Sequence, residues 1–166
     1  MSDFLLPNFE NIPLEIQQNF RWAVWKAEPR ANKPGKFNKA PRSPITGRNI
    51  SVNKPESFSS YEVCQEAYKK GNFTGVGILL QDNDWVGIDI DDLYQIPQEQ
   101  KIEIEKWIQK AFAVGAYIER SPSSRGLRVL IKGTFEGNGK KKGALEIYKS
   151  QRFLTITGCL VKPDCA

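Results

Sequence analysis

The 166-residue sequence contains no histidine and only three cysteines, and these absences argue against several kinds of site. Without histidine, the chain cannot carry a Ser-His-Asp or Cys-His catalytic arrangement, or a zinc or haem site with histidine ligands. The cysteines are odd in number and lack CxxC spacing, which argues against a disulfide framework or a zinc knuckle. We therefore expect reduced thiols at Cys64, Cys159 and Cys165, and a cytoplasmic location.

Long apolar segments are also missing. No run of 18 or more apolar residues is present, so no membrane-spanning helix is expected. The first residues lack the basic region and the long apolar stretch of a secretory signal. A chain of this length, with 40% hydrophobic and 26% charged residues, is typical of one globular domain, which we predict to span residues 1–166.

The 24 Lys and Arg residues exceed the 19 Asp and Glu residues, which gives a net charge of +5, and the basic residues form two clusters. The segment 26–48 is rich in proline and glycine and is predicted to be an irregular loop; the segment 137–143 is predicted to be a cationic hairpin tip. We expect both clusters to bind DNA phosphates, with a solvated loop that binds nothing as the alternative for each. The predicted DNA-binding residues are Lys33, Lys36, Lys39, Lys140, Lys141 and Lys142.

Hydrophobic periodicity predicts an α+β fold with two main helices and six or seven largely antiparallel strands. A capping box of Ser59 and Glu62 predicts a first helix that stops at Gly71, and a 3.6-residue period predicts a second helix at 98–113. A turn at 81–84 is expected to join two of the strands. The predicted strands are 21–26, 75–80, 85–91, 116–119, 127–132, 144–148 and 153–157.

The strand at 85–91 is the most informative segment, because alternation places Asp89 and Asp91 on one face, about 7 Å apart. Two unpaired carboxylates repel each other, so we expect a divalent cation, Mg²⁺ or Mn²⁺, between them, and we expect the fold to survive replacement of either one. Glu146 has a similar setting on strand 144–148, and three such acids form the usual ligand set for two-metal phosphoryl transfer. The alternative is a solvated face on which Glu146 pairs with a lysine.

The segment 119–129 is a turn that runs into a strand, and it gathers three serine hydroxyls with several arginines. Arg128 faces away from its aliphatic neighbours on that strand, which could be the side that holds the acids, and a guanidinium binds phosphate oxygens through a planar fork. A salt bridge from Arg128 to Asp89 or Asp91 is the alternative. The candidate nucleotide-binding residues are Ser121, Ser123, Arg125, Arg128 and Arg152.

The order of these motifs resembles the primase-polymerase domain of the archaeo-eukaryotic primase superfamily, in the branch found at the N-terminus of phage, plasmid and mobile-element replication proteins. The resemblance covers about 20–158 and is carried by a tryptophan strand, a Lys/Pro loop ending in PITG, IDID at 88–91, ERSPS at 119–123 and EIY at 146–148. It implies an RRM-like catalytic core in which Asp89, Asp91 and Glu146 are the catalytic, metal-binding residues. It also implies that 121–128 and Arg152 bind the incoming nucleotide.

The activity that the resemblance implies is primer synthesis or extension on a single-stranded DNA template, with nucleoside triphosphates as substrates and a replicative helicase as a possible partner. Arg128 stands where the family commonly has histidine, and Ser124 where it has glycine. Arginine retains a grip on phosphate but cannot shuttle a proton, so this departure and the short chain predict an impaired enzyme. The alternative is a non-catalytic domain that binds nucleotides or single-stranded DNA. A nuclease or other phosphodiesterase built on the same acids is a third possibility.

Overall fold

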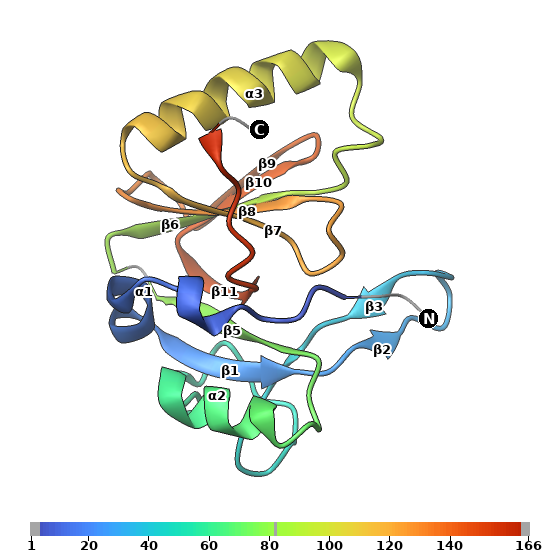
Figure 1. Ribbon diagram of the computed structural model, residues 1–166, viewed down its shortest axis with the longest axis vertical. Helices are drawn as coiled ribbons and strands as arrows, with labels where there is room; N and C mark the ends of the chain where they lie inside the picture. Colours follow the sequence, from blue (N-terminus) through green and yellow to red (C-terminus); the bar gives the residue numbers. More distant parts are fainter. Residues whose placement is uncertain (1–3, 82, 164–166) are drawn as a thin grey trace.

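The computed structural model of the chain describes residues 4–81 and 83–163, which form two antiparallel sheets, a short ribbon and three α-helices (Figure 1). The strands of the larger sheet are β6 (Trp85–Ile90), β7 (Tyr117–Arg120), β8 (Leu127–Lys132), β9 (Gly139–Lys142) and β10 (Leu145–Tyr148). Those of the smaller sheet are β1 (Arg21–Trp25), β4 (Pro41–Arg42), β5 (Gly75–Gln81) and β11 (Ser150–Ile156). The ribbon consists of β2 (Glu28–Pro29) and β3 (Phe37–Asn38). The α-helices are α1 (Leu14–Asn19), α2 (Tyr61–Lys69) and α3 (Gln98–Ala113). Two 3-10 turns are η1 (Phe9–Asn11) and η2 (Pro55–Ser57).

Every pair of neighbouring strands is antiparallel. The five-stranded sheet has the order β7-β8-β6-β10-β9, and the four-stranded sheet has the order β11-β5-β1-β4. The chain passes from one sheet to the other between β5 and β6 and again between β10 and β11. The predicted α+β class with mostly antiparallel pairing is therefore confirmed, whereas the RRM-like arrangement stays a prediction.

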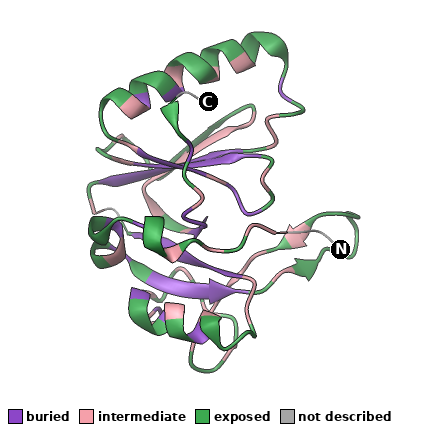
Figure 2. Ribbon diagram, in the orientation of Figure 1, coloured by how far each residue is buried: buried purple, intermediate pink, exposed green. Residues whose placement is uncertain are grey.

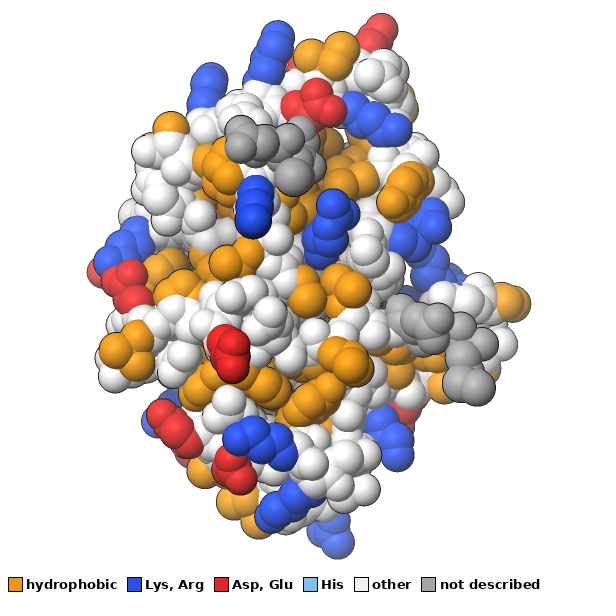
Figure 3. Space-filling model, in the orientation of Figure 1, with side chains coloured by type: hydrophobic (Ala, Val, Ile, Leu, Met, Phe, Trp, Pro, Cys, Tyr) orange, Lys and Arg blue, Asp and Glu red, His pale blue; other side chains and the backbone are white. Residues whose placement is uncertain are grey.

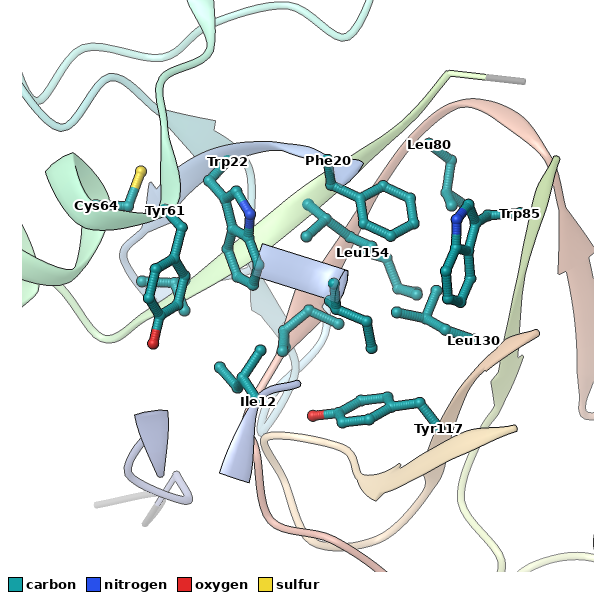
Figure 4. Packing of buried hydrophobic residues seen from close by; sticks show 14 of the residues in the cluster. Ile12, Phe20, Trp22, Tyr61, Cys64, Leu80, Trp85, Tyr117, Leu130 and Leu154 are labelled. Atoms are coloured by element: carbon teal, nitrogen blue, oxygen red, sulfur yellow. The ribbon is translucent and has the colours of Figure 1, made fainter. Parts of the chain in front are cut away.

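Strands β6 and β8 of the five-stranded sheet are buried on both faces, whereas β9 is exposed at its edge (Figure 2). The face formed by Ile88, Ile90 and Val129 packs against Ile108 and Ala111 of α3. The other face packs against the four-stranded sheet, in a cluster that Figure 4 shows around Trp85, Leu130 and Leu154. Burial of these apolar side chains is the main favourable contribution to folding, and it fixes which residues of β6 and β8 face the second sheet.

Some local predictions were wrong by a residue or by an element. Helix α2 begins after Ser60, whose Oγ accepts from the amide of Val63 at 3.4 Å; Ser59 instead exchanges two backbone hydrogen bonds of 2.8 Å with Trp22. The short helix α1 was not predicted, and the predicted loop at 26–48 contains β2, β3 and β4. The predicted lysine-bearing hairpin tip is in fact strand β9, paired with β10. The predicted turn includes Asp82, which lies outside the described residues.

The predicted reduced thiols are found at Cys64 and Cys159, which are both free, while Cys165 lies outside the described residues. Within 4–81 and 83–163, no helix is both long and apolar enough to cross a membrane.

The start of the described chain is tied to loops that lie far away in sequence. The amide of Leu5 donates to the carbonyl of Pro122 at 2.8 Å, and that of Asn8 donates to the carbonyl of Thr157 at 2.7 Å. Gly158 has a φ of +67°, and a Cβ there would lie 2.0 Å from the carbonyl oxygen of Asn8, so only glycine fits. The N-terminal segment is therefore held against the loops that form the site described next.

Candidate functional site

A row of five charged residues crosses the five-stranded sheet on the face opposite α3. The strand register pairs Glu119 with Arg128, Arg128 with Asp89, Asp89 with Glu146, and Glu146 with Lys141. Directly paired residues of antiparallel strands have Cβ atoms about 4.5–5.5 Å apart, so neighbouring side chains in this row can interact. Sequence alternation alone placed Asp89 and Glu146 on one face of their strands, and the register makes them direct neighbours.

Asp89 and Arg128 form a buried ion pair in the middle of this row. Arg128 Nη1 donates to Asp89 Oδ1, and the two residues are only 8% and 7% exposed. Burial raises the pKa of Asp89, and the positive charge of Arg128 opposes that rise. Nε of Arg128 is buried and hydrogen-bonds to no described residue. The structure thus shows the alternative interpretation, in which Arg128 forms a salt bridge with Asp89. Truncation of Asp89 would leave a buried, unpaired cation. The expectation that the fold survives loss of Asp89 is therefore not supported.

Glu146 is held by three neighbours. Lys141 Nζ lies 2.5 Å from its Oε1, the Tyr148 hydroxyl donates to its Oε2, and Arg152 Nη2 lies 3.6 Å from the same oxygen. Burial alone would raise the pKa of Glu146, but the hydrogen bonds from Lys141 and Tyr148 outweigh it and hold this pKa below its usual value. Arg152 also stacks on the Tyr148 ring, 4.4 Å from its centroid, so the predicted nucleotide contact Arg152 lies beside Glu146.

Glu119 closes the other end of the row and was not predicted as a site residue. Its side chain is completely buried; it accepts a hydrogen bond from the Tyr117 hydroxyl and others from the amides of Thr157 and Gly158, at 2.7–3.0 Å. Burial raises the pKa of Glu119 to about 7, even though all three donors favour its charged form. The side chain therefore anchors the turn after β11. In the sequence, Glu119 lies two residues after Tyr117 on a predicted strand, so both side chains are expected on one face. Nothing in the sequence indicates that Glu119 binds amides far along the chain.

The loop at 121–125 is closed by its own hydrogen bonds. The buried Ser121 exchanges bonds with Gly126: its amide donates to the Gly126 carbonyl at 2.8 Å, and its Oγ accepts from the Gly126 amide at 3.1 Å. A Cβ on Gly126 would lie 2.2 Å from the carbonyl oxygen of Ile90, so glycine lets this loop approach β6. Ser124, where the family commonly has glycine, has a φ of +62°, a conformation that favours glycine.

Arg125 extends from this loop toward Asp92. Its Nη2 donates to both carboxylate oxygens of Asp92, at 2.9 and 3.0 Å, and its guanidinium lies over the ring of the exposed Tyr94, 5.1 Å from the centroid. The guanidinium is thus held in place at the edge of the site while remaining half-exposed.

A cleft of about 690 Å³ brings the loop at 121–125, the end of β6 and the β2–β3 segment together. Figure 3 shows Lys and Arg side chains at several places on this face, and some of them lie on its right-hand side, the side on which Figure 1 draws β2 and β3. The cleft has the volume of a typical small-molecule site. Its charged and hydroxyl-bearing lining residues are Arg30, Lys33, Lys36, Lys39, Asp91, Asp92, Ser121, Ser123 and Arg125.

This cleft unites residues that the sequence analysis assigned to different partners. Lys33, Lys36 and Lys39, predicted to bind DNA, line the same space as the predicted nucleotide-binding residues Ser121 and Ser123. The lysines of β9 are elsewhere: they are exposed on the edge strand of the five-stranded sheet. Arg30, Asp92 and Phe4 also line the cleft and were not predicted; the basic loop gave a signal for Arg30, whereas nothing pointed to Phe4.

The carboxylates fit the expected metal only in part. Among the residues that the structure describes, no three Asp, Glu or Cys side chains are grouped as metal ligands. Asp91 lines the cleft and makes no ion pair within the described ranges, and Oδ2 of Asp89 accepts no hydrogen bond from a described residue. Carboxylate oxygens suit Mg²⁺ and Mn²⁺, so Asp89 and Asp91 have the donor chemistry for one such ion. Glu146 is already engaged by Lys141 and Tyr148.

Comparison with known proteins agrees with the motif order. No protein-family model matches the chain. The chain is similar to the DNA primase-polymerase of Nitratiruptor phage NrS-1, with 29% identity over 145 residues, an alignment that covers 83% of this chain and 19% of that protein. The chain thus spans a small part of the length of this curated relative. The similarity confirms the resemblance to a primase-polymerase domain that the motifs predicted.

Proposed function

We propose that this chain is the nucleotide-binding and catalytic domain of a DNA primase-polymerase, which transfers nucleotides to a 3′ end on a single-stranded DNA template. The observation that carries the proposal is the composition of the cleft. The carboxylates of Asp91 and Asp92 line it together with the hydroxyls of Ser121 and Ser123, and basic side chains of the β2–β3 segment line it as well. A site for a triphosphate and a divalent cation needs these two kinds of group side by side.

The residues have separable roles in this proposal. The hydroxyls of Ser121 and Ser123 and the guanidinium of Arg125 bind phosphate oxygens and orient the nucleotide. Asp89 and Asp91 would hold a divalent cation, which lowers the pKa of the attacking 3′-hydroxyl and stabilises the charge that develops on the phosphate. In the reaction, the 3′-hydroxyl loses its proton to water and its oxygen forms a bond to the α-phosphorus, while the bond to the bridging oxygen breaks and pyrophosphate leaves with the electron pair.

One observation favours the second candidate, a domain that binds nucleotides or single-stranded DNA without catalysis. Arg128 neutralises Asp89 in the interior, and Lys141 neutralises Glu146, so two of the three expected ligands are already paired. A cation at Asp89 must then compete with a buried guanidinium. This arrangement predicts weak metal binding in the absence of nucleotide.

Primer extension on a labelled, primed single-stranded template with dNTPs and Mg²⁺ or Mn²⁺ tests the proposal. Asp91→Asn should reduce extension about 100-fold or more, because it removes one of the two carboxylates that would hold the divalent cation. Asp84→Asn is the matched control, since Asp84 is an exposed turn residue with a φ of +62° that asparagine also adopts.

Extension by the wild-type protein and by Asp84→Asn, but not by Asp91→Asn, supports the polymerase. Binding of dNTPs without extension supports the second candidate instead. Equal extension by wild type and Asp91→Asn would show that the cleft is not the catalytic site.

A further inference from the structure

Lys39 follows β3 and reaches into the cleft with most of its side chain covered. Its ammonium lies over two aromatic rings, 5.7 Å from the centroid of Phe4 and 6.0 Å from that of Trp25. The Phe4 ring in turn meets the Trp25 ring edge to face at 5.5 Å. The faces of the rings attract the cation, so Lys39 is a positioned group, unlike a lysine on a solvated loop.

Among the described residues, the arginines Arg125 and Arg128 have carboxylate partners and Lys39 does not. Arg125 is bound to Asp92, and Arg128 to Asp89, whereas Lys39 forms no ion pair among the residues at 4–81 and 83–163. It lies within electrostatic range of Asp89, whose charge favours the ammonium, and of Arg128, whose charge opposes it.

Burial, followed by the charge of Arg128, lowers the pKa of Lys39 to about 8. Among the described residues, no carboxylate neutralises this ammonium through an ion pair. An anion that enters the cleft would satisfy it.

We propose that Lys39 binds the triphosphate of the incoming nucleotide, and that it does so in place of the DNA contact predicted from its position in a basic loop. The inference rests on the proposed function and assigns this residue within it. Asp91 marks where the reacting phosphate lies, and the loop at 121–125 lines one side of the same space. Lys39 approaches from the β2–β3 side, so a triphosphate between these walls meets hydroxyls on one side and an ammonium on the other.

Two features favour a nucleotide over a DNA backbone as the partner. The ammonium lies over the rings of Phe4 and Trp25 and within electrostatic range of the acids, whereas the β9 lysines that could follow a DNA strand are exposed on a sheet edge. The cleft of about 690 Å³ also has the size of a small-ligand site, and a triphosphate presents its negative charges close together.

The test compares Lys39→Met, Lys39→Arg and the control Lys70→Met by calorimetric titration with dATP and with dAMP in Mg²⁺, without template. Lys70 is an exposed lysine after α2 and borders a different depression. Methionine has an unbranched apolar side chain of nearly the same length as lysine and removes the charge. Thermal unfolding of each variant checks that the fold is retained.

We expect Lys39→Met to weaken dATP binding about tenfold or more, the usual effect of losing a hydrogen bond between charged groups. Binding of dAMP, which lacks the β- and γ-phosphates, should change less than twofold. Lys39→Arg should retain most of the dATP affinity. Equal weakening of dATP and dAMP would overturn the assignment. Unchanged dATP binding together with weaker binding of a labelled oligo(dT) would also overturn the assignment, because it would show that Lys39 contacts DNA. If the wild-type protein does not bind dATP, the proposed function itself fails, and this result is distinct from failure of the Lys39 assignment.

Discussion

Glu119 is completely buried at the end of the charged row, and its replacement by alanine should cost the protein a large part of its stability. The substitution leaves three buried donors without an acceptor: the hydroxyl of Tyr117 and the amides of Thr157 and Gly158. An unsatisfied buried donor costs about 1–3 kcal/mol. Removal of the carboxylate also removes its own desolvation penalty, so we take the lower end of the range for each donor.

The expected loss is therefore about 3 kcal/mol, which is a large fraction of the about 5–15 kcal/mol by which domains are usually stable. For a chain of this size, that loss corresponds to a decrease of about 6–12 °C in melting temperature. Glu119→Gln retains one oxygen acceptor of nearly the same shape and should lose less. Glu103→Ala, at an exposed position of α3, is the control and should change the free energy of unfolding by less than about 0.5 kcal/mol.

Urea unfolding, followed by tryptophan fluorescence and far-UV circular dichroism, measures these differences. Coincident transitions by the two probes would justify a two-state free energy for each variant. A loss below about 1 kcal/mol for Glu119→Ala would refute the reasoning, because it would mean that water or rearranged backbone satisfies the three donors at little cost.

Three further predictions follow from other charged groups. Asp89→Ala should lower the free energy of unfolding by about 3 kcal/mol or more, because the substitution leaves Arg128 buried and unpaired. Asp91→Ala should leave the free energy of unfolding almost unchanged, and urea unfolding of both variants would measure the difference. The pKa of Lys39 is about 8 in the folded protein and higher in the unfolded chain, so the unfolded chain binds more protons between these values. The wild-type protein should therefore gain stability relative to Lys39→Met as the pH rises above about 8, and melting curves of both proteins at several pH values would show it. Replacing the three lysines at 140–142 by alanine should weaken single-stranded DNA binding irrespective of sequence and reduce the salt slope by about 0.7 for each lost phosphate contact, as fluorescence anisotropy at several salt concentrations would measure.

The elements with strong periodicity could be predicted from the sequence, and those set by tertiary contacts could not. The predicted helix at 98–113 has the bounds of α3, because its apolar residues recur at helical spacing. The first residue of α2 was missed because Ser59 and Ser60 are both good capping residues, and the backbone pairing of Ser59 with Trp22 decides between them. The six-residue α1 carries too short a pattern to predict.

The site could be predicted to the level of strand faces. Alternation placed Asp89 and Glu146 on the faces that form the charged row, because side-chain direction has a period of two. The pairing of the charged side chains depends on strand register and on side-chain rotamers. The sequence therefore did not decide whether Arg128 binds Asp89, binds Asp91 or remains available for phosphate. The hydrogen bonds of Glu119 to amides almost forty residues away have no local signal at all.

The tie between the two ends of the described chain also bears on how the protein matures during synthesis. The amide of Asn8 binds the carbonyl of Thr157, and the amide of Leu5 binds that of Pro122, which follows the first serine of the cleft loop. These contacts join residues near the start of the described chain to residues that are translated more than a hundred positions later. A nascent chain can form α2 and pair β1 with β5 early, but it cannot fix Asn8 and Glu119 in place until Thr157 and Gly158 have been released. The basic segment at 26–48 is therefore translated long before the acidic strand and the loop that share its cleft are in place.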